Sequence, residues 1–337
     1  MKRILQLTVA FVLMVVFLWL FLRSSNLSDV WRILESTNPW WLATGLIVNW
    51  FALVFRTLRW RLILDADDPP PFYDTFFANT CGYMLSTILP IRAGDVARPA
   101  LLSRRTRVRF SAALGTVLTE RILDLYSLLL LYVYFAVVHW NDYAGSTSFF
   151  IIKSGAVGAA VVLGILSIFI VGLFFARNSI RRAHEFLGRI LPQRFRAAWL
   201  NFFDSFVESL SIVQRPSVLI RVLLCTAGVW FTLTAQFWIV TIAMHHPLPF
   251  DASFFVTGIT TLGLAIPTPG GVGGFHKACQ LVLTHFYDFG IDASVAVAIV
   301  FHVVGTLPVL VTGLVLFIKE GLSWSELKQA SRDEAET

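Results

Sequence analysis

Three groups of polar residues have types and spacings that could do chemistry. The first is Pro90-Ile91-Arg92-Ala93-Gly94-Asp95-Val96-Ala97-Arg98. Arginine presents a planar fork of donors that matches a phosphate or a carboxylate, and Gly94 lets the backbone turn closely around a ligand. Arg92 and Arg98 are therefore candidate anion-binding residues, with Gly94 and Asp95 beside them. The alternative is that Arg92 pairs with Asp95 and that Arg98 is an ordinary cation on the cytoplasmic surface.

The second group is Thr119-Glu120-Arg121-Ile122-Leu123-Asp124, which lies inside the apolar run 110–138. In a helix, Glu120 and Asp124 share one face because they are four residues apart, and Arg121 lies beside them. Glu120 would lie about 15 Å along such a helix from its start. If the run crosses a membrane, ionisable residues at that depth are a functional-site hypothesis. The alternative is a structural ion-pair cluster with a nearby arginine, for which the candidates are Arg56, Arg59 and Arg92.

The third group is Thr268-Pro269-Gly270-Gly271-Val272-Gly273-Gly274-Phe275-His276-Lys277. Glycines that open a helix expose backbone N–H groups at its positive end, which is a ready anion site. The candidate residues are Pro269, Gly270, Gly271, Gly273, Gly274, His276 and Lys277. The alternative is that the glycines only permit a tight turn and close helix contact. The group is not a nucleotide-binding fingerprint, because no strand precedes it and the spacing of a P-loop is absent.

A single histidine, His302, lies in an apolar run near the C-terminus. It could face His276, and imidazole titrates near neutral pH, although a lone helical histidine is also an ordinary interior residue. The pair His245-His246 lacks spaced carboxylate or cysteine partners for a metal. The sequence shows no nucleophile beside a base either. We therefore predict no metal, no cofactor and no catalytic residue, and we do not expect an enzyme.

The composition indicates where these groups lie. Of the 337 residues, 56% are hydrophobic and only 14% are charged, and the mean hydropathy is +0.71. A soluble domain carries about a quarter charged residues, so this chain is predicted to be a membrane protein. That excludes a soluble enzyme or a nucleic-acid-binding protein as the default. The three cysteines lie far apart in apolar stretches and predict no disulfide framework.

Six apolar runs are long enough to cross a membrane as helices, which takes about 20 residues. They are 4–22, 40–64, 110–138, 149–176, 218–244 and 293–319. The first has no small-residue cleavage site, so we expect it to be retained rather than removed as a signal peptide. Six arginines lie in 92–109 and seven in 177–215, whereas 139–148 and 245–251 contain no Lys or Arg. The positive-inside rule then places both termini in the cytoplasm, in a cell membrane.

Two apolar stretches are too short to span and are predicted to be re-entrant hairpins. One is 72–89, which opens from the cytoplasm, and the other is 252–266 with 272–286, which opens from outside. Irregular backbone at membrane depth is tolerated only where protein or a wet cavity surrounds it. Both tips share an apolar-Pro-x-x-small-Gly pattern. This similarity favours an inverted repeat with a site at the midplane, but it covers only six residues, so chance is the alternative.

The segment 177–215 is predicted to be cytoplasmic and amphipathic. Its apolar residues recur at helical spacing up to Leu210, while Arg196, Asn201, Asp204, Ser205 and Glu208 occupy the other side. Such a helix lies in the membrane interface or packs on the protein's own cytoplasmic face. The predicted fold class is therefore an all-α polytopic membrane protein. We expect one transmembrane domain over 1–320 and a short polar cytoplasmic tail over 321–337.

Several motifs together resemble a known family. They are Arg59-Trp60, the stretch from Asn79 to Arg98, the Glu120–Asp124 segment, and Pro267-Thr268-Pro269-Gly270-Gly271-Val272-Gly273. These motifs occur in the order of a known family. The chain resembles the flippase-like membrane family that includes the N-terminal transmembrane part of lysylphosphatidylglycerol synthases. The resemblance covers about 56–315, nearly the whole chain.

The resemblance implies a translocase that moves an anionic or aminoacylated lipid, with phosphate-bearing membrane lipids as partners. Two other functions stay open: an intramembrane lipid-phosphate transferase or hydrolase with Glu120 or Asp124 as base, and a scaffold for a lipid-synthesising enzyme. The family pattern has a Glu after the glycine tip and an Arg in the last span, where this chain has His276 and His302. The synthases of this family continue into a soluble aminoacyl-transfer domain. We do not expect such a domain in this chain, and so we do not expect it to make lysyl-lipid.

Overall fold

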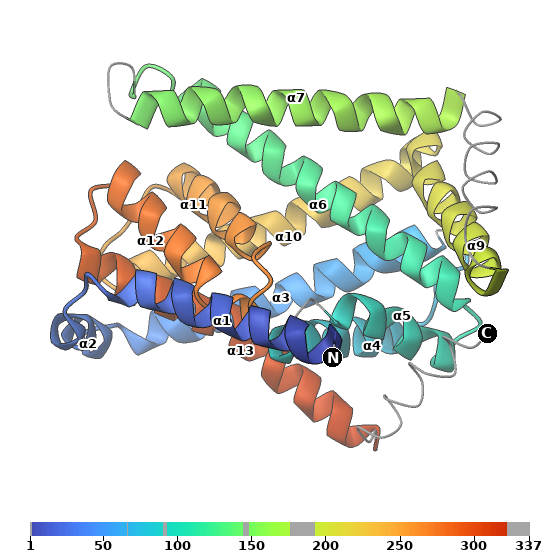
Figure 1. Cartoon of the computed structure of the whole chain (residues 1–337), viewed down its shortest axis with the longest axis horizontal. Helices are drawn as coiled ribbons and strands as arrows, with labels where there is room; N and C mark the ends of the chain where they lie inside the picture. The colour runs from blue at the N-terminus through green and yellow to red at the C-terminus, as the bar shows by residue number, and fades with distance from the viewer. Residues whose placement is uncertain (1, 66, 90–92, 144–147, 176–192, 322–337) are drawn as a thin grey trace. The chain divides into compact units, whose positions relative to one another are not determined.

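A computed structural model describes residues 2–65, 67–89, 93–143, 148–175 and 193–321 (Figure 1). Within these ranges the chain is helical and contains no strand. The α-helices are α1 (Lys2–Leu22), α2 (Leu27–Glu35), α3 (Pro39–Leu64), α4 (Phe72–Ile88), α5 (Gly94–Arg105), α6 (Phe110–Val138), α7 (Ser148–Phe175), α9 (Gln193–Leu210), α10 (Pro216–Ala243), α11 (Phe250–Gly263), α12 (Gly274–Phe286) and α13 (Ile291–Lys319). Two 3-10 helices are η2 (Ser211–Gln214) and η3 (Pro269–Gly271). The predicted all-α fold is confirmed.

Five of these helices are long and apolar enough to cross a membrane, namely α3, α6, α7, α10 and α13. Their bounds agree with five predicted spans to within two residues. The sixth predicted span, α1, bends by 83° into α2 and counts as a span only if this bent pair crosses as one. The sequence analysis missed the bend. Asn26 explains it, because its side chain caps α2 and its backbone N–H donates to Asp292 Oδ1 at 2.7 Å.

The chain divides into two compact units, each built from separated segments. Unit 1 comprises residues 1–54, 79–97 and 228–337, and unit 2 comprises residues 55–78 and 98–227. Helices α3, α4, α5 and α10 each contribute one end to unit 1 and the other to unit 2. Of the predicted segments, 177–192 and 322–337 lie outside the described residues.

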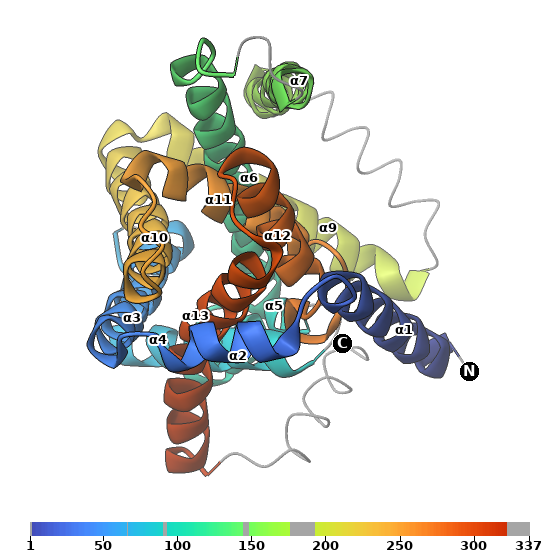
Figure 2. The same ribbon diagram turned by 90° about the vertical axis from the view of Figure 1, so that its left-hand side faces the viewer.

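Unit 1 contains the reversals that the sequence predicted as hairpins. Helices α11 and α12 lie side by side (Figures 1 and 2) and touch through glycines, since a Cβ on Gly263 would lie 2.6 Å from Gly274 O. In the same way, Gly94 at the start of α5 lies against Gly82 O and Ser86 Oγ of α4. With 12 to 17 residues each, these four helices are shorter than the roughly 20 residues that a span needs.

A proline inside α13 has its missing hydrogen bond replaced by another helix of unit 1. Pro308 has no N–H, so the carbonyl of Val304, four residues earlier, loses its helical donor. The buried side chain of Asn49 on α3 donates instead, to Val304 O at 3.1 Å and to Gly305 O at 2.8 Å. Gly45, one turn before Asn49, allows the approach, since a Cβ there would lie 3.2 Å from Val304.

In unit 2, α9 packs against α6. A Cβ on Gly115 would lie 2.8 Å from the backbone N of Phe206, and Thr119 Oγ1 lies 2.6 Å from Ser209 Oγ. Phe206 is buried. The predicted amphipathic helix therefore forms. Of the two predicted locations, the membrane interface and the protein's own surface, it packs on the protein. Ser205 was wrongly assigned to the polar side. It is buried because its backbone lies against Gly115.

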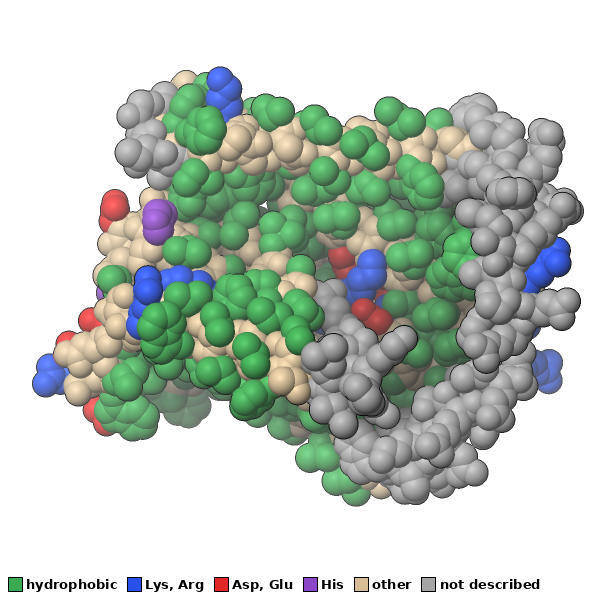
Figure 3. All heavy atoms as spheres, viewed as in Figure 1, with side chains coloured by type: hydrophobic (Ala, Val, Ile, Leu, Met, Phe, Trp, Pro, Cys, Tyr) green, Lys and Arg blue, Asp and Glu red, His purple; other side chains and the backbone are tan. Residues whose placement is uncertain are grey.

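Helix α7 lies against α6 but presents apolar side chains over most of its surface. Its exposed residues include Phe150, Val161, Ile165, Ile168 and Phe169. Hydrophobic side chains cover α7 along the top of the view in Figure 3. A helix that is apolar on all sides and mostly uncovered by protein is suited to contact with lipid.

Candidate functional site

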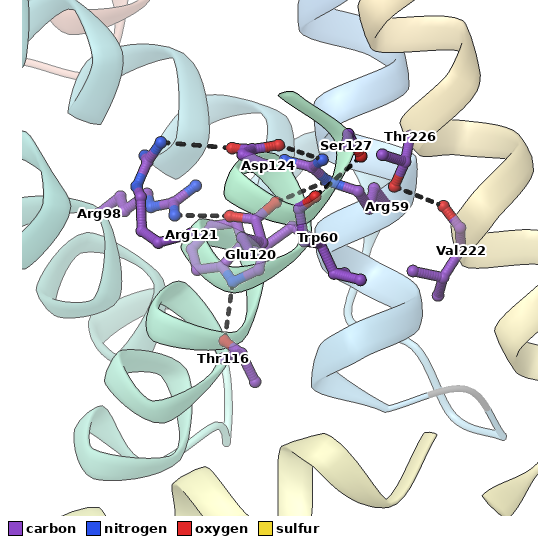
Figure 4. Close-up of polar contacts among 11 residues, drawn as sticks. Arg59, Trp60, Arg98, Thr116, Glu120, Arg121, Asp124, Ser127, Val222 and Thr226 are labelled. Carbon is purple, nitrogen blue, oxygen red and sulfur yellow. Dashed lines mark hydrogen bonds and ion pairs between the residues drawn. The ribbon is translucent and has the colours of Figure 1, made fainter. Parts of the chain in front are cut away.

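Five charged residues of unit 2 form a connected group, here called the ion-pair cluster: Arg59, Arg98, Glu120, Arg121 and Asp124. Arg59 Nε donates to Glu120 Oε1 at 3.2 Å, and Arg98 Nη2 lies 2.5 Å from Glu120 Oε2. Arg59 Nη1 also donates to Asp124 Oδ1 at 2.6 Å, and Arg121 Nη1 donates to Asp124 Oδ2 at 3.4 Å. Figure 4 shows these side chains converging from α3, α5 and α6.

The ion-pair cluster is closed at one end and open at the other. The side chains of Arg59 and Glu120 have no exposed surface and that of Arg98 has 1%, whereas Asp124 and Arg121 are 25% and 29% exposed. The four-residue spacing of Glu120 and Asp124 on α6 puts both carboxylates within reach of Arg59. A ligand can therefore approach the Arg121–Asp124 end without first breaking the pairs around Glu120.

A tryptophan next to the cluster holds Arg98 in place. The guanidinium carbon of Arg98 lies 5.0 Å from the Trp60 ring centroid, a cation–π contact. The Trp60 indole donates to Thr116 Oγ1 at 2.9 Å, and Thr116 lies one turn before Glu120 on α6. The sequence analysis did not assign Thr116. Its position four residues before Glu120 was the available signal, because it puts both on one helix face.

The structure resolves two of the alternatives left open by the sequence. Arg98 is not a surface cation, because it is buried and paired with Glu120. Arg59, one of the candidate arginine partners, donates to both carboxylates. Arg92 lies outside the described residues. Gly94 is buried and Asp95 half-buried at the start of α5, in unit 1, whereas the ion-pair cluster lies in unit 2.

The glycine group of unit 1 forms a turn with positive φ angles that leads into α12. Gly270, Gly271 and Gly273 have φ values of 61°, 72° and 92°, which only glycine adopts readily. The expectation that glycines open a helix holds for Gly273, the N-cap of α12, and for Gly274, its first residue, whereas Gly270 and Gly271 lie before it in η3. Pro269 begins η3, and its carbonyl accepts from the N–H of Val272.

This turn meets the end of α4. A Cβ on Gly270 would lie 2.8 Å from the carbonyl oxygen of Thr87, near the end of α4. Gly273 packs on α1, since a Cβ there would lie 2.7 Å from Phe17. The glycine turn and the end of α4 are thus in contact within unit 1, and bare glycine backbone makes that contact.

The two histidines of unit 1 face each other, as the sequence analysis suggested. The ring centroids of His276 on α12 and His302 on α13 are 4.6 Å apart. Phe21 and Phe275 pack against the pair with centroids 5.2 Å from His276 and 5.0 Å from His302. Lys277 turns to Gln280, donating to its Oε1 at 2.6 Å. In the described part of the chain, no three His, Cys, Asp or Glu residues are grouped to hold a metal.

Comparison with known families agrees with this helical architecture. The lysylphosphatidylglycerol synthase transmembrane region matches residues 4–313 of this chain. The chain belongs to that family. Both hairpin tips, the ion-pair cluster and the histidine pair lie within the matched residues.

Individual relatives of this family member have low sequence identity to it. A UPF0104 membrane protein of Methanocaldococcus jannaschii is 23% identical over 69% of this chain and 92% of its own length. Another, from Methanothermobacter thermautotrophicus, is 28% identical over 34% of this chain and 33% of its own. The glycosyltransferase AglD of Haloferax volcanii is 20% identical over 85% of this chain, which spans half of that relative.

Proposed function

We propose that this protein translocates a lipid with an anionic phosphate in its headgroup, and that the ion-pair cluster receives the phosphate. The observation that carries the proposal is the convergence of guanidinium groups on one site, at which the Arg121 side chain is 29% exposed. Among the described residues, three guanidinium groups surround two carboxylates in α6, a predicted membrane span. A cation inside hydrocarbon costs several kcal/mol unless an anion accompanies it. A lipid phosphate supplies that anion, and arginine binds it with paired hydrogen bonds.

The arrangement supports binding better than acid–base chemistry. A general base needs a free carboxylate oxygen within reach of the substrate. Both oxygens of Glu120 are held by arginines, one by Arg59 and the other by Arg98. Glu120 therefore serves to orient the two guanidinium groups. The half-exposed Arg121, at the open end of the cluster, is the proposed first contact for an incoming headgroup.

The test is lipid movement by the purified protein in liposomes that carry fluorescent phosphatidylglycerol or phosphatidylcholine. We expect the wild type to transfer chemically unchanged phosphatidylglycerol to the opposite leaflet faster than phosphatidylcholine. Arg121→Gln should slow the transfer about tenfold, because one charge-assisted hydrogen bond contributes about 1.5–3 kcal/mol. Arg215→Gln is the matched control, since Arg215 pairs with Asp67 at the exposed surface of the same unit.

Two results would contradict the proposal and identify the alternatives. A new lipid product in place of unchanged lipid would indicate an intramembrane enzyme. Absence of movement in the wild type, together with co-purification of a lipid-synthesising enzyme, would indicate a scaffold. We further propose the cell membrane as the location, with both termini in the cytoplasm, because the Arg-rich segments would then lie inside.

A further inference from the structure

The histidine pair of unit 1 lies beside the glycine turn and is linked to it by one hydrogen bond. The N–H of Gly273 donates to His276 Nδ1 at 3.4 Å. A backbone N–H can only donate, so Nδ1 carries a lone pair and the proton of the neutral ring lies on Nε2. Nδ1 is therefore the atom of His276 that can still take up a proton, and it is already used to hold the turn.

This hydrogen bond belongs to a short ladder that fixes the turn. Gly271 N–H donates to Thr268 O and Val272 N–H donates to Pro269 O, both at 3.1 Å. His276 completes the set by accepting from Gly273. Within the same turn, Gly270 lies close to Thr87 O, where the turn meets the end of α4. A change at His276 Nδ1 thus acts on Gly273, at the end of a turn in which Gly270 touches Thr87 O of α4.

His302 gives the pair its second imidazole. It is half-buried, whereas His276 is 7% exposed, so His302 is the more accessible ring. Two imidazolium ions with ring centroids 4.6 Å apart would repel each other strongly in a low-dielectric surrounding. The pair therefore accepts one extra proton in place of two. His302 is the entry to His276 in this arrangement.

The surroundings of the pair contain few other charges. Helices α1, α11 and α13 pack against α12, the 3-10 helix η3 packs against α1, and α2 packs against α13. The rings of Phe21 and Phe275 contact the pair. Apart from the two histidines, the titratable and charged residues of these elements and of the α1–α2 link are Lys2, Arg3, Arg23, Asp29, Arg32, Glu35, Asp251, Lys277, Cys279, His285, Asp292 and Lys319.

Those residues lie mainly near helix ends and several have partners of their own. Asp292 accepts from Asn26, and Lys277 donates to Gln280. Cys279 is fully buried on α12, and His285 bonds to Leu281 O on its own helix. No carboxylate among the described residues forms an ion pair with either ring. A proton on the pair is therefore not neutralised locally, and its charge acts on the turn.

We propose that His276 and His302 form a single proton-binding site that controls the contact between the glycine turn and the end of α4. When His276 Nδ1 is protonated, Gly273 loses its acceptor and faces a second N–H donor. The turn 268–273 then loosens, and Gly270 separates from Thr87 O. This role rests on the proposed lipid transport: the proton is then the coupling ion, and the contact between Gly270 and Thr87 is the gate.

The first test measures the turn itself and does not depend on transport. Amide hydrogen exchange of the peptide covering 264–275 is followed in lipid nanodiscs from pH 7 to pH 3, after correction for intrinsic exchange, because burial lowers the pKa of His276 to about 3. The opening equilibrium of the wild type should increase about fivefold on acidification, the factor that corresponds to loss of one hydrogen bond of about 1 kcal/mol. In His276→Asn the amide oxygen keeps accepting from Gly273 and cannot titrate, so exchange should not change with pH.

Two further variants keep the result interpretable. His302→Gln should move the pH midpoint and keep the increase, because His276 then titrates without its neighbour. That variant carries the test if His276→Asn does not fold. His285→Asn, at the other end of α12, should behave like the wild type. A wild-type turn with no pH response, or a response that persists in His276→Asn, would overturn the proposal.

A transport assay on the same variants separates this proposal from the proposed function. Coupling predicts that the rate of lipid transfer depends on pH in the wild type and not in His276→Asn. Lipid transfer without pH dependence would overturn the coupling and leave the transport function intact. Absence of transfer in the wild type would contradict the transport function. The exchange measurement would still decide whether the histidine pair controls the turn.

Discussion

Neutralising Glu120 is the sharpest test of the ion-pair cluster as a closed structural unit. In Glu120→Gln, the buried guanidinium groups of Arg59 and Arg98 lose the carboxylate that both contact. Removing one partner of a buried ion pair costs about 3–5 kcal/mol, because it leaves a buried charge uncompensated. Asp124 still pairs with Arg59, so we expect the lower end of that range. A loss of about 3 kcal/mol lowers the folding equilibrium constant roughly 150-fold.

The free energy of unfolding can be measured by SDS titration in mixed micelles, with helicity as the signal. Asp67→Asn is the control, because Asp67 pairs with Arg215 where both side chains are exposed. Exposed pairs contribute about 0–1 kcal/mol, so its loss should be small. Adding Arg98→Met to Glu120→Gln should recover part of the lost stability, since one uncompensated guanidinium is then gone.

The reasoning fails if Glu120→Gln unfolds within about 1 kcal/mol of the wild type. It also fails if Arg98→Met and Glu120→Gln are additive, because residues in direct contact should show an interaction energy of 0.5–3 kcal/mol. Either result would mean that water or another charge already screens Glu120, contrary to its complete burial.

Three further variants test the packing of the two units. Asn49→Leu should lower the free energy of unfolding by about 1–3 kcal/mol because it leaves the buried Val304 carbonyl unsatisfied. Pro308→Ala should reduce that loss by restoring the helical donor, and an unchanged loss would contradict the role of Asn49 as its substitute. Gly115→Val should cost about 1–3 kcal/mol by overpacking and raise amide exchange in α9, whereas unchanged exchange would exclude the close α6–α9 contact. Gly270→Ala should weaken the protection of the glycine turn, as measured by exchange, because φ is positive there; normal protection would refute the turn geometry.

Long apolar runs were sufficient to predict the principal helices. Helices α3, α6, α10 and α13 needed only run length, because a membrane span requires about 20 apolar residues whatever they pack against. The bend after α1 was missed because its cause is remote. Asn26 bonds to Asp292, which is 266 residues away in the chain. Contacts between distant residues leave no local pattern in one sequence.

The candidate site was found by residue type, but its pairing was not. An arginine near many other arginines has the sequence pattern of a cytoplasmic surface residue, and Arg98 was ambiguous for that reason. Burial against Trp60 and bonding to Glu120 distinguish it. The glycine turn was assigned to a helix start because glycine spacing does not specify the sign of φ. His276 and His302 were suspected of facing each other, and that is confirmed.

The chain order of the ion-pair cluster has a consequence for biosynthesis. Helix α6 carries two acids and one arginine, and isolated charges at the centre of a span disfavour insertion by about 2.5–3.5 kcal/mol each. Arg59 and Arg98 precede α6 in the chain, so both leave the ribosome before Glu120. We expect α6 to enter the membrane against arginines that are already present, whereas α7, which has no such charges near its centre, can insert unaided. Deleting either early arginine would then appear first as failed insertion of a helix synthesised later.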